Sequence, residues 1–180
     1  TYAKSTAPED QKPLIQCEYN HTMGNSGGGF KEYWNLVRKY PKYQGGFIWD
    51  FVDQGLHGKD KNGTPIYTYG GDYNDYDGSD NNFNCNGIIG PDRQLNPHAY
   101  EVAYVHQNIW ATPIDLQTGK IKVFNEYFFR DLSNYKLVWK LLAGGRTIQQ
   151  GEIDRLNIAP QQTAEYTLPY HLDAVTNADE

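Results

Sequence analysis

The sequence predicts a chain with an α/β part followed by an all-β part. Two short apolar runs, at residues 14–17 and 44–52, flank an amphipathic segment at 30–40. This order indicates a strand–helix–strand unit with two parallel strands. From residue 109 onward, short strand-like segments alternate with turns, as is typical of an antiparallel, immunoglobulin-like β-sandwich. We therefore predict two domains, 1–108 and 109–180.

The first apolar run is short enough to be a buried strand, and Glu18 stands at its carboxyl end. His21 and Ser26 follow in one loop, and three glycines precede the helical segment. In barrels and open α/β sheets this edge carries the binding and catalytic groups. A carboxylate there is costly unless it has a partner or a function. The structural alternative for Glu18 is an ion pair or a cap.

The helical segment places its apolar residues on one face, and Pro41 ends it. The second run ends in Trp49 and Asp50, so both polar clusters are expected at the same edge of the sheet. Residues 57–96 are loop-like apart from a short strand at 66–69. Asn96 as N-cap and Pro97 as first residue then open a helix, which we expect to reach about residue 108.

The predicted strands of the second domain are separated by turn residues. They cover residues 112–116, 121–129, 136–142, 146–153 and 163–168.

Composition narrows the possible partners. The net charge is −6 and Lys and Arg form no cluster, which disfavours nucleic acid. No apolar run approaches the roughly 20 residues that span a bilayer, so we expect no membrane partner. Cys17 and Cys85 show neither metal-ligand spacing nor a disulfide framework, and Cys17 is predicted to be a small buried hydrophobe. The compartment, cytoplasmic or periplasmic, stays open.

Three motifs in order resemble the β-galactosidases of glycoside hydrolase family 2. They are CEYNHTMGNS at 17–26, GGFIWDFVDQ at 45–54 and FNCNG at 83–87. The resemblance runs from about residue 13 into the second domain. It implies that residues 1–108 are the C-terminal part of a (β/α)8 TIM-barrel catalytic domain, with 14–17 as its seventh strand and 46–51 as its eighth. The immunoglobulin-like domain would be the one that follows the barrel.

The resemblance also assigns roles to individual residues. Glu18 matches the nucleophile of a retaining glycosidase, which forms a glycosyl-enzyme intermediate that water hydrolyses. The matching substrate-binding residues are Tyr19 and His21 in the galactose subsite, Trp49 as the aromatic floor under the sugar, and Asn86. Phe83, through its carbonyl, and Asn86 match ligands of a sodium ion, for which hard oxygen donors are suited.

Several parts of the family pattern have no match in this chain. A retaining mechanism needs a second carboxylic acid about 5–5.5 Å from the nucleophile, and in the family it comes from an earlier barrel strand. The magnesium ligands and a further sodium ligand also lie outside this sequence, and Ser79 stands where an Asn is expected. We therefore expect the isolated chain to be inactive. The whole enzyme is expected to need sodium and magnesium, the rest of its polypeptide and other copies of itself as a homo-oligomer.

Two alternatives remain from the sequence. The aromatic-rich segment 67–76 is also compatible with a non-enzymatic carbohydrate-binding or structural module built on the β-sandwich. A relative that acts on another β-glycoside, such as a glucuronide or a mannoside, would share most of the same motifs.

Overall fold

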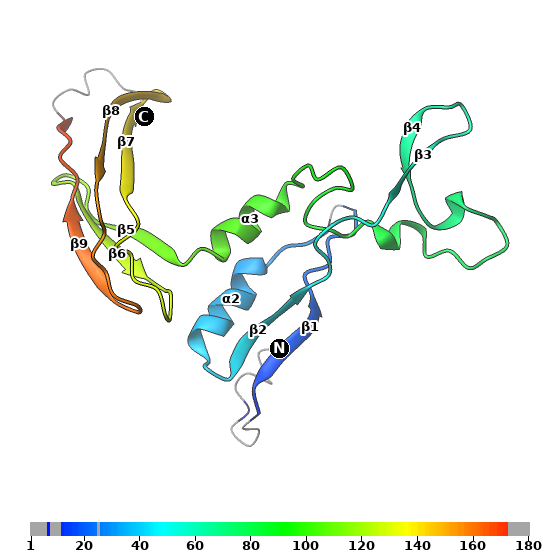
Figure 1. The fold of residues 1–180 in the computed structure, drawn as a ribbon, viewed down its shortest axis with the longest axis horizontal. Helices are drawn as coiled ribbons and strands as arrows, with labels where there is room; N and C mark the ends of the chain where they lie inside the picture. The colour runs from blue at the N-terminus through cyan, green and yellow to red at the C-terminus, as the bar shows by residue number, and fades with distance from the viewer. Residues whose placement is uncertain (1–6, 8–11, 25, 173–180) are drawn as a thin grey trace. The chain divides into compact units, whose positions relative to one another are not determined.

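The computed structural model describes residues 7, 12–24 and 26–172, and it divides the chain into two units, Thr1–His106 and Gln107–Glu180. The first unit is α/β and the second contains only strands (Figure 1). This confirms the predicted order of the two classes of structure. Within the described residues, neither α-helix has the length and apolar character that crossing a bilayer requires.

A parallel strand pair with one helix between its strands forms the base of the first unit. Strand β1 (Leu14–Tyr19) pairs with β2 (Tyr43–Ile48), and helix α2 (Phe30–Lys39) connects them (Figure 1). The helix begins after Gly29, whose φ of 64° lies in the left-handed region that glycine adopts without penalty. Arg38 in the last turn complements the negative end of the helix dipole. The predicted strand–helix–strand unit is therefore confirmed.

The core of this unit lies between α2, the end of β1 and helix α3 (His98–Val105). Its fully packed members are Tyr19, Phe30, Val102 and Val105. A hydrogen bond of 2.8 Å from Arg38 Nη2 to the carbonyl oxygen of Val105 ties the two helices together. This packing fixes the chain that leaves β1, where the candidate nucleophile lies.

The segment between β2 and α3 is more ordered than the sequence predicts. Strands β3 (Leu56–Lys59) and β4 (Pro65–Thr68) form an antiparallel hairpin, followed by the 3-10 turns η1 (Gly70–Asp72) and η2 (Asn81–Asn84). The predicted strand at 66–69 is β4. Its partner β3 was missed because the sequence LHGK contains one apolar side chain and no alternation.

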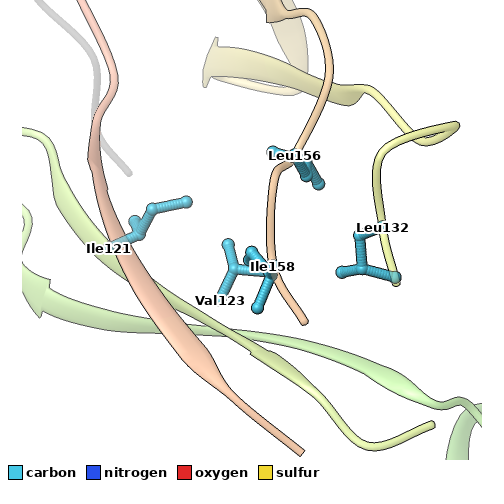
Figure 2. Close-up of a cluster of buried hydrophobic side chains, with 5 residues drawn as sticks. All are labelled: Ile121, Val123, Leu132, Leu156 and Ile158. Carbon is cyan, nitrogen blue, oxygen red and sulfur yellow. The ribbon is translucent and has the colours of Figure 1, made fainter. Parts of the chain in front are cut away.

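The second unit consists of two antiparallel sheets around one core. Strands β5 (Ile109–Asp115), β6 (Lys120–Asn125) and β9 (Thr163–Thr167) form one sheet, and β7 (Leu137–Ala143) pairs with β8 (Arg146–Ile153) in the other. Figure 2 shows the buried side chains at its centre, which are Ile121, Val123, Leu132, Leu156 and Ile158. Residues of both sheets pack against this cluster. The β-rich prediction is confirmed, and the immunoglobulin-like topology stays a prediction.

Four predicted details are wrong. The second strand ends at Ile48 rather than at residue 51 or 52, because the backbone of the following residues bonds to residues 84–89 instead. Helix α3 begins at His98, with Pro97 as its N-cap, and ends at Val105. Cys17 is exposed, as is Ile15 two positions earlier in β1.

The fourth detail is the end of β6, which stops at Asn125 instead of continuing to residue 129. The Asn125 side chain is fully buried, and its Nδ2 lies within hydrogen-bond distance of the carbonyl oxygens of Arg130, Ile158 and Ala159. A buried amide must satisfy its polar atoms internally, and these bonds turn the chain away from the sheet.

Candidate active site

Glu18 and His21 form a close polar pair at the carboxyl end of β1. His21 Nε2 lies 2.5 Å from Glu18 Oε2, and the two side chains are 42% and 37% exposed, respectively. His21 lies three positions after Glu18 in the chain, so the loop folds back over the strand end to bring the imidazole onto the carboxylate. A partner for the Glu18 carboxylate is therefore present, as the structural alternative of an ion pair requires. The pair remains accessible to a ligand.

Tyr19 points away from this pair and into the core. The end of β1 departs from regular alternation: Cys17 and Glu18 are both exposed and Tyr19 is buried, at the point where the β1–β2 register shifts. Tyr19 is 3% exposed, and its ring contacts Phe30 and Tyr33. Trp34 Nε1 donates a 3.2 Å hydrogen bond to the Tyr19 hydroxyl, and burial raises the pKa of that hydroxyl. The Tyr19 and Glu18 side chains therefore lie in different environments, although the sequence motif places both residues in the candidate site.

The end of β2 lies directly beside the end of β1. The backbone N–H of Trp49 donates to the carbonyl oxygen of Tyr19 at 3.2 Å, and the Trp49 side chain is 37% exposed. The peptide bonds before Glu18 and before Asp50 are both cis. The two polar clusters predicted for one sheet edge are therefore neighbours in the structure.

Asn86 reaches this edge through backbone pairing with Asp50. The N–H of Asp50 donates to the Asn86 carbonyl oxygen at 3.1 Å, and the N–H of Ile88 donates to the carbonyl oxygen of Asp50 at 3.0 Å. Asn86 is 2% exposed. Phe83 lies three residues earlier, in η2, and its side chain is about half exposed. Both predicted sodium ligands thus belong to one short segment that is anchored at the end of β2.

Three buried carboxylate or amide oxygens at this edge have no hydrogen-bond partner among the described residues. They are Asn20 Oδ1, Asp50 Oδ1 and Asn86 Oδ1. The other carboxylate oxygen of Asp50 accepts a 2.5 Å hydrogen bond from Gln54 Nε2. A buried oxygen without a donor is costly unless a ligand or a cation completes it. The Asn86 amide oxygen is a hard donor and therefore fits a sodium ion.

Acidic side chains also set the local electrostatic field. Burial raises the pKa of the Cys85 thiol, and the nearby carboxylates of Asp53 and Asp50 raise it further. The same negative charges favour a cation beside Asn86.

Across the described part of the chain, no three His, Cys, Asp or Glu side chains gather as a metal site. At the position where an Asn was expected, the Ser79 hydroxyl accepts the N–H of Asn81 at 3.2 Å.

Sequence reasoning missed the residues that hold Asn86 in place. Asp53, Asn96 and His98 all hydrogen-bond to backbone groups of Gly87, the next residue in the chain. The available signal was the glycine itself, since a glycine is often required where another backbone segment approaches closely. Without the fold, nothing in the sequence says which segment approaches it.

Comparison of the sequence with protein-family models relates both units of the chain to the same family of enzymes. The family model described as "Glycosyl hydrolases family 2, TIM barrel domain" matches residues 1–111, and "Beta-galactosidase, domain 4" matches residues 121–180. These matches follow the change from α/β to all-β structure along the chain.

Curated relatives agree with the family models. A β-galactosidase of Pseudoalteromonas haloplanktis is 45% identical over 167 residues, covering 89% of this chain and 16% of the relative. One of Yersinia enterocolitica is 40% identical over 168 residues, covering 93% and 16%. One of Photobacterium profundum is 43% identical over 166 residues, covering 91% and 16%. The chain thus spans about one sixth of the length of these relatives, and it belongs to family 2 of the glycosyl hydrolases.

Proposed function

We propose that this chain is a segment of a retaining β-galactosidase that hydrolyses terminal β-D-galactose residues of β-galactosides. The observation that carries the proposal is the half-exposed Glu18 carboxylate at the end of a parallel strand, with His21 at 2.5 Å. Trp49 and Asn86 lie along the same edge through backbone hydrogen bonds. The β-galactosidase names of relatives at 40–45% identity support the choice of substrate.

In the proposed mechanism, Glu18 is the nucleophile. Its free oxygen attacks the anomeric carbon, the bond to the leaving oxygen breaks, and a glycosyl-enzyme forms. Water then attacks the same carbon, gives its proton to the group that protonated the leaving oxygen, and releases the sugar together with the free carboxylate. His21 holds one carboxylate oxygen and thereby limits the orientations of the other. The acid that protonates the leaving group must come from another part of the whole polypeptide.

The remaining residues bind the sugar. The exposed face of Trp49 packs against the apolar face of the galactose ring, since aromatic faces suit such contacts. Asn86 would contact the sugar, and its side-chain oxygen and the Phe83 carbonyl would hold a sodium ion, which would supply a positive charge to the subsite. Tyr19, which the resemblance places in the galactose subsite, supports the strand from the core side, where its hydroxyl accepts the Trp34 N–H. Magnesium ligands are expected elsewhere in the whole enzyme.

We further propose that residues 1–108 are the last two β/α units of a TIM barrel and that residues 109–180 form an immunoglobulin-like sandwich. The parallel pairing of β1 and β2 supports the first part, and the two packed antiparallel sheets support the second. The exposed face of β1 and β2 would then be covered by the rest of the barrel. On this basis the 180-residue chain alone does not hydrolyse β-galactosides.

The substitution Glu18→Gln in the whole protein tests this function. It keeps the size of the side chain and removes the nucleophile, so kcat for a nitrophenyl β-galactoside falls by roughly 10³-fold or more. Asp60→Asn, which alters a carboxylate in the turn between β3 and β4, is the matched control and leaves kcat unchanged. A near wild-type rate in Glu18→Gln would exclude Glu18 as the nucleophile.

A further inference from the structure

Both polar backbone groups of Gly87 are held by side chains from other segments. The Gly87 N–H donates a 2.7 Å hydrogen bond to Asp53 Oδ1. The Gly87 carbonyl oxygen accepts a 3.0 Å hydrogen bond from Asn96 Nδ2 and lies 3.1 Å from His98 Nε2. Asp53 follows β2, whereas Asn96 and His98 lie at the start of α3. Three side chains from two segments therefore converge on one residue.

The backbone at Gly87 is also in direct contact with residues 52–53. A Cβ atom at position 87 would lie 2.2 Å from Asp53 N and 2.5 Å from the carbonyl carbon of Val52. These distances are far inside van der Waals contact, and the atoms involved are backbone atoms that cannot rotate away. Only glycine allows this approach, so the segment after Asn86 is fixed sterically as well as by hydrogen bonds.

Asn86, immediately before Gly87, is fixed on its other side by the pairing with Asp50. The Asn86 carbonyl oxygen accepts from the Asp50 N–H at 3.1 Å, and the Asn84 carbonyl oxygen accepts from the Gln54 N–H at 2.7 Å. The buried Asn86 Oδ1 is left without a hydrogen-bond partner among the described residues. A binding group held this way loses little conformational freedom when a ligand arrives, which strengthens binding.

We propose that Asp53, with Asn96 and His98, forms a clamp on Gly87 that positions Asn86 for sugar and cation binding. Asp53 is a positioning residue, because its carboxylate is engaged by the Gly87 N–H and acts through the backbone. The carboxylate makes the bond charge-assisted, which is stronger than a bond between neutral groups. The inference rests on the proposed β-galactosidase function and adds to it the residues that set the affinity of the Asn86 subsite.

The test compares Asp53→Ala with Asp53→Asn in the whole protein. Asp53→Ala removes the acceptor and raises KM for a nitrophenyl β-galactoside by about 10-fold, with kcat changed less, because a hydrogen bond to a charged group is lost. Asp53→Asn retains an acceptor oxygen and restores most of the affinity. The sodium concentration that gives half-maximal galactose binding, measured by calorimetry at constant ionic strength, rises in Asp53→Ala and returns toward wild type in Asp53→Asn.

Asp60→Ala is the matched control, since Asp60 Oδ1 also accepts two backbone N–H groups, at 2.8 Å each, but in the β3–β4 turn. It leaves both KM and the sodium requirement unchanged. If Asp53→Ala does not fold, His98→Leu removes a single donor to Gly87 and raises KM by about threefold. The clamp is overturned if KM is unchanged in the folded variants, or if Asp53→Asn is as impaired as Asp53→Ala. In either case an active wild-type protein still supports the proposed function. A wild type without galactosidase activity refutes the function and the clamp together.

Discussion

At the scale of single residues, neighbouring positions in the chain have opposite environments. Glu18 lies on the open face of β1 with His21 against its carboxylate, whereas Tyr19 is buried beneath α2. The sequence motif alone assigned all three residues to the candidate site, because the identity and order of residues in a motif carry no information about the direction of their side chains. Regular strand alternation does not supply it either, because Cys17 and Tyr19 are two positions apart and differ in exposure where the β1–β2 register shifts. Tyr19 is therefore a support of the site rather than a part of its surface.

The substitution Tyr19→Phe distinguishes these roles. It removes the hydroxyl that accepts the Trp34 N–H, so the free energy of unfolding falls by about 1 kcal/mol. KM for the galactoside stays within about twofold of wild type, because the hydroxyl does not face the substrate. Urea unfolding and steady-state kinetics provide the two measurements. Tyr76→Phe, on an 84% exposed side chain, is the control that changes neither. A large increase in KM for Tyr19→Phe would mean that its hydroxyl contacts the sugar.

At the scale of elements, the strands and helices of the core were easier to predict than the segments that build the site. Strand β8 (Arg146–Ile153) matches its predicted range, and the parallel pair β1–β2 follows from two apolar runs around one amphipathic helix. The pairing of residues 50–53 with 86–89 has no periodic pattern, because it depends on individual backbone bonds and on the missing side chain of Gly87. The position of Asn86 therefore required the structure.

Gly87→Ala tests the importance of this contact between segments. The added methyl group would collide with the backbone at residues 52–53, so the free energy of unfolding falls by about 1–3 kcal/mol. Gly78→Ala is a matched control, because a Cβ atom there meets nothing within 4 Å. Thermal unfolding of both variants provides the comparison. Equal stability of Gly87→Ala and wild type would show that the two segments are not packed this closely.

At the scale of the whole molecule, the chain combines one sheet edge that holds the candidate site with one all-β unit that packs around its own core. The two family models match the two parts in the same order, and the relatives are about six times longer than the matched region. The family could be recognised from three motifs in the sequence. The topology of the second unit could not be predicted in the same way. The alternation of apolar and polar residues indicates which face of each strand is buried and where the turns lie, but it leaves the order of the strands in the sheets open.

The identity of the nucleophile is the central claim, and covalent trapping in the whole protein tests it most directly. A 2-deoxy-2-fluoro-β-galactoside with a good leaving group slows the second step, so the glycosyl-enzyme accumulates. Proteolysis and mass spectrometry then locate the attached sugar. We predict a single fluorogalactosyl adduct on Glu18 and none in Glu18→Gln. An adduct on any other carboxylate, or a fully active protein that forms none, would contradict the account.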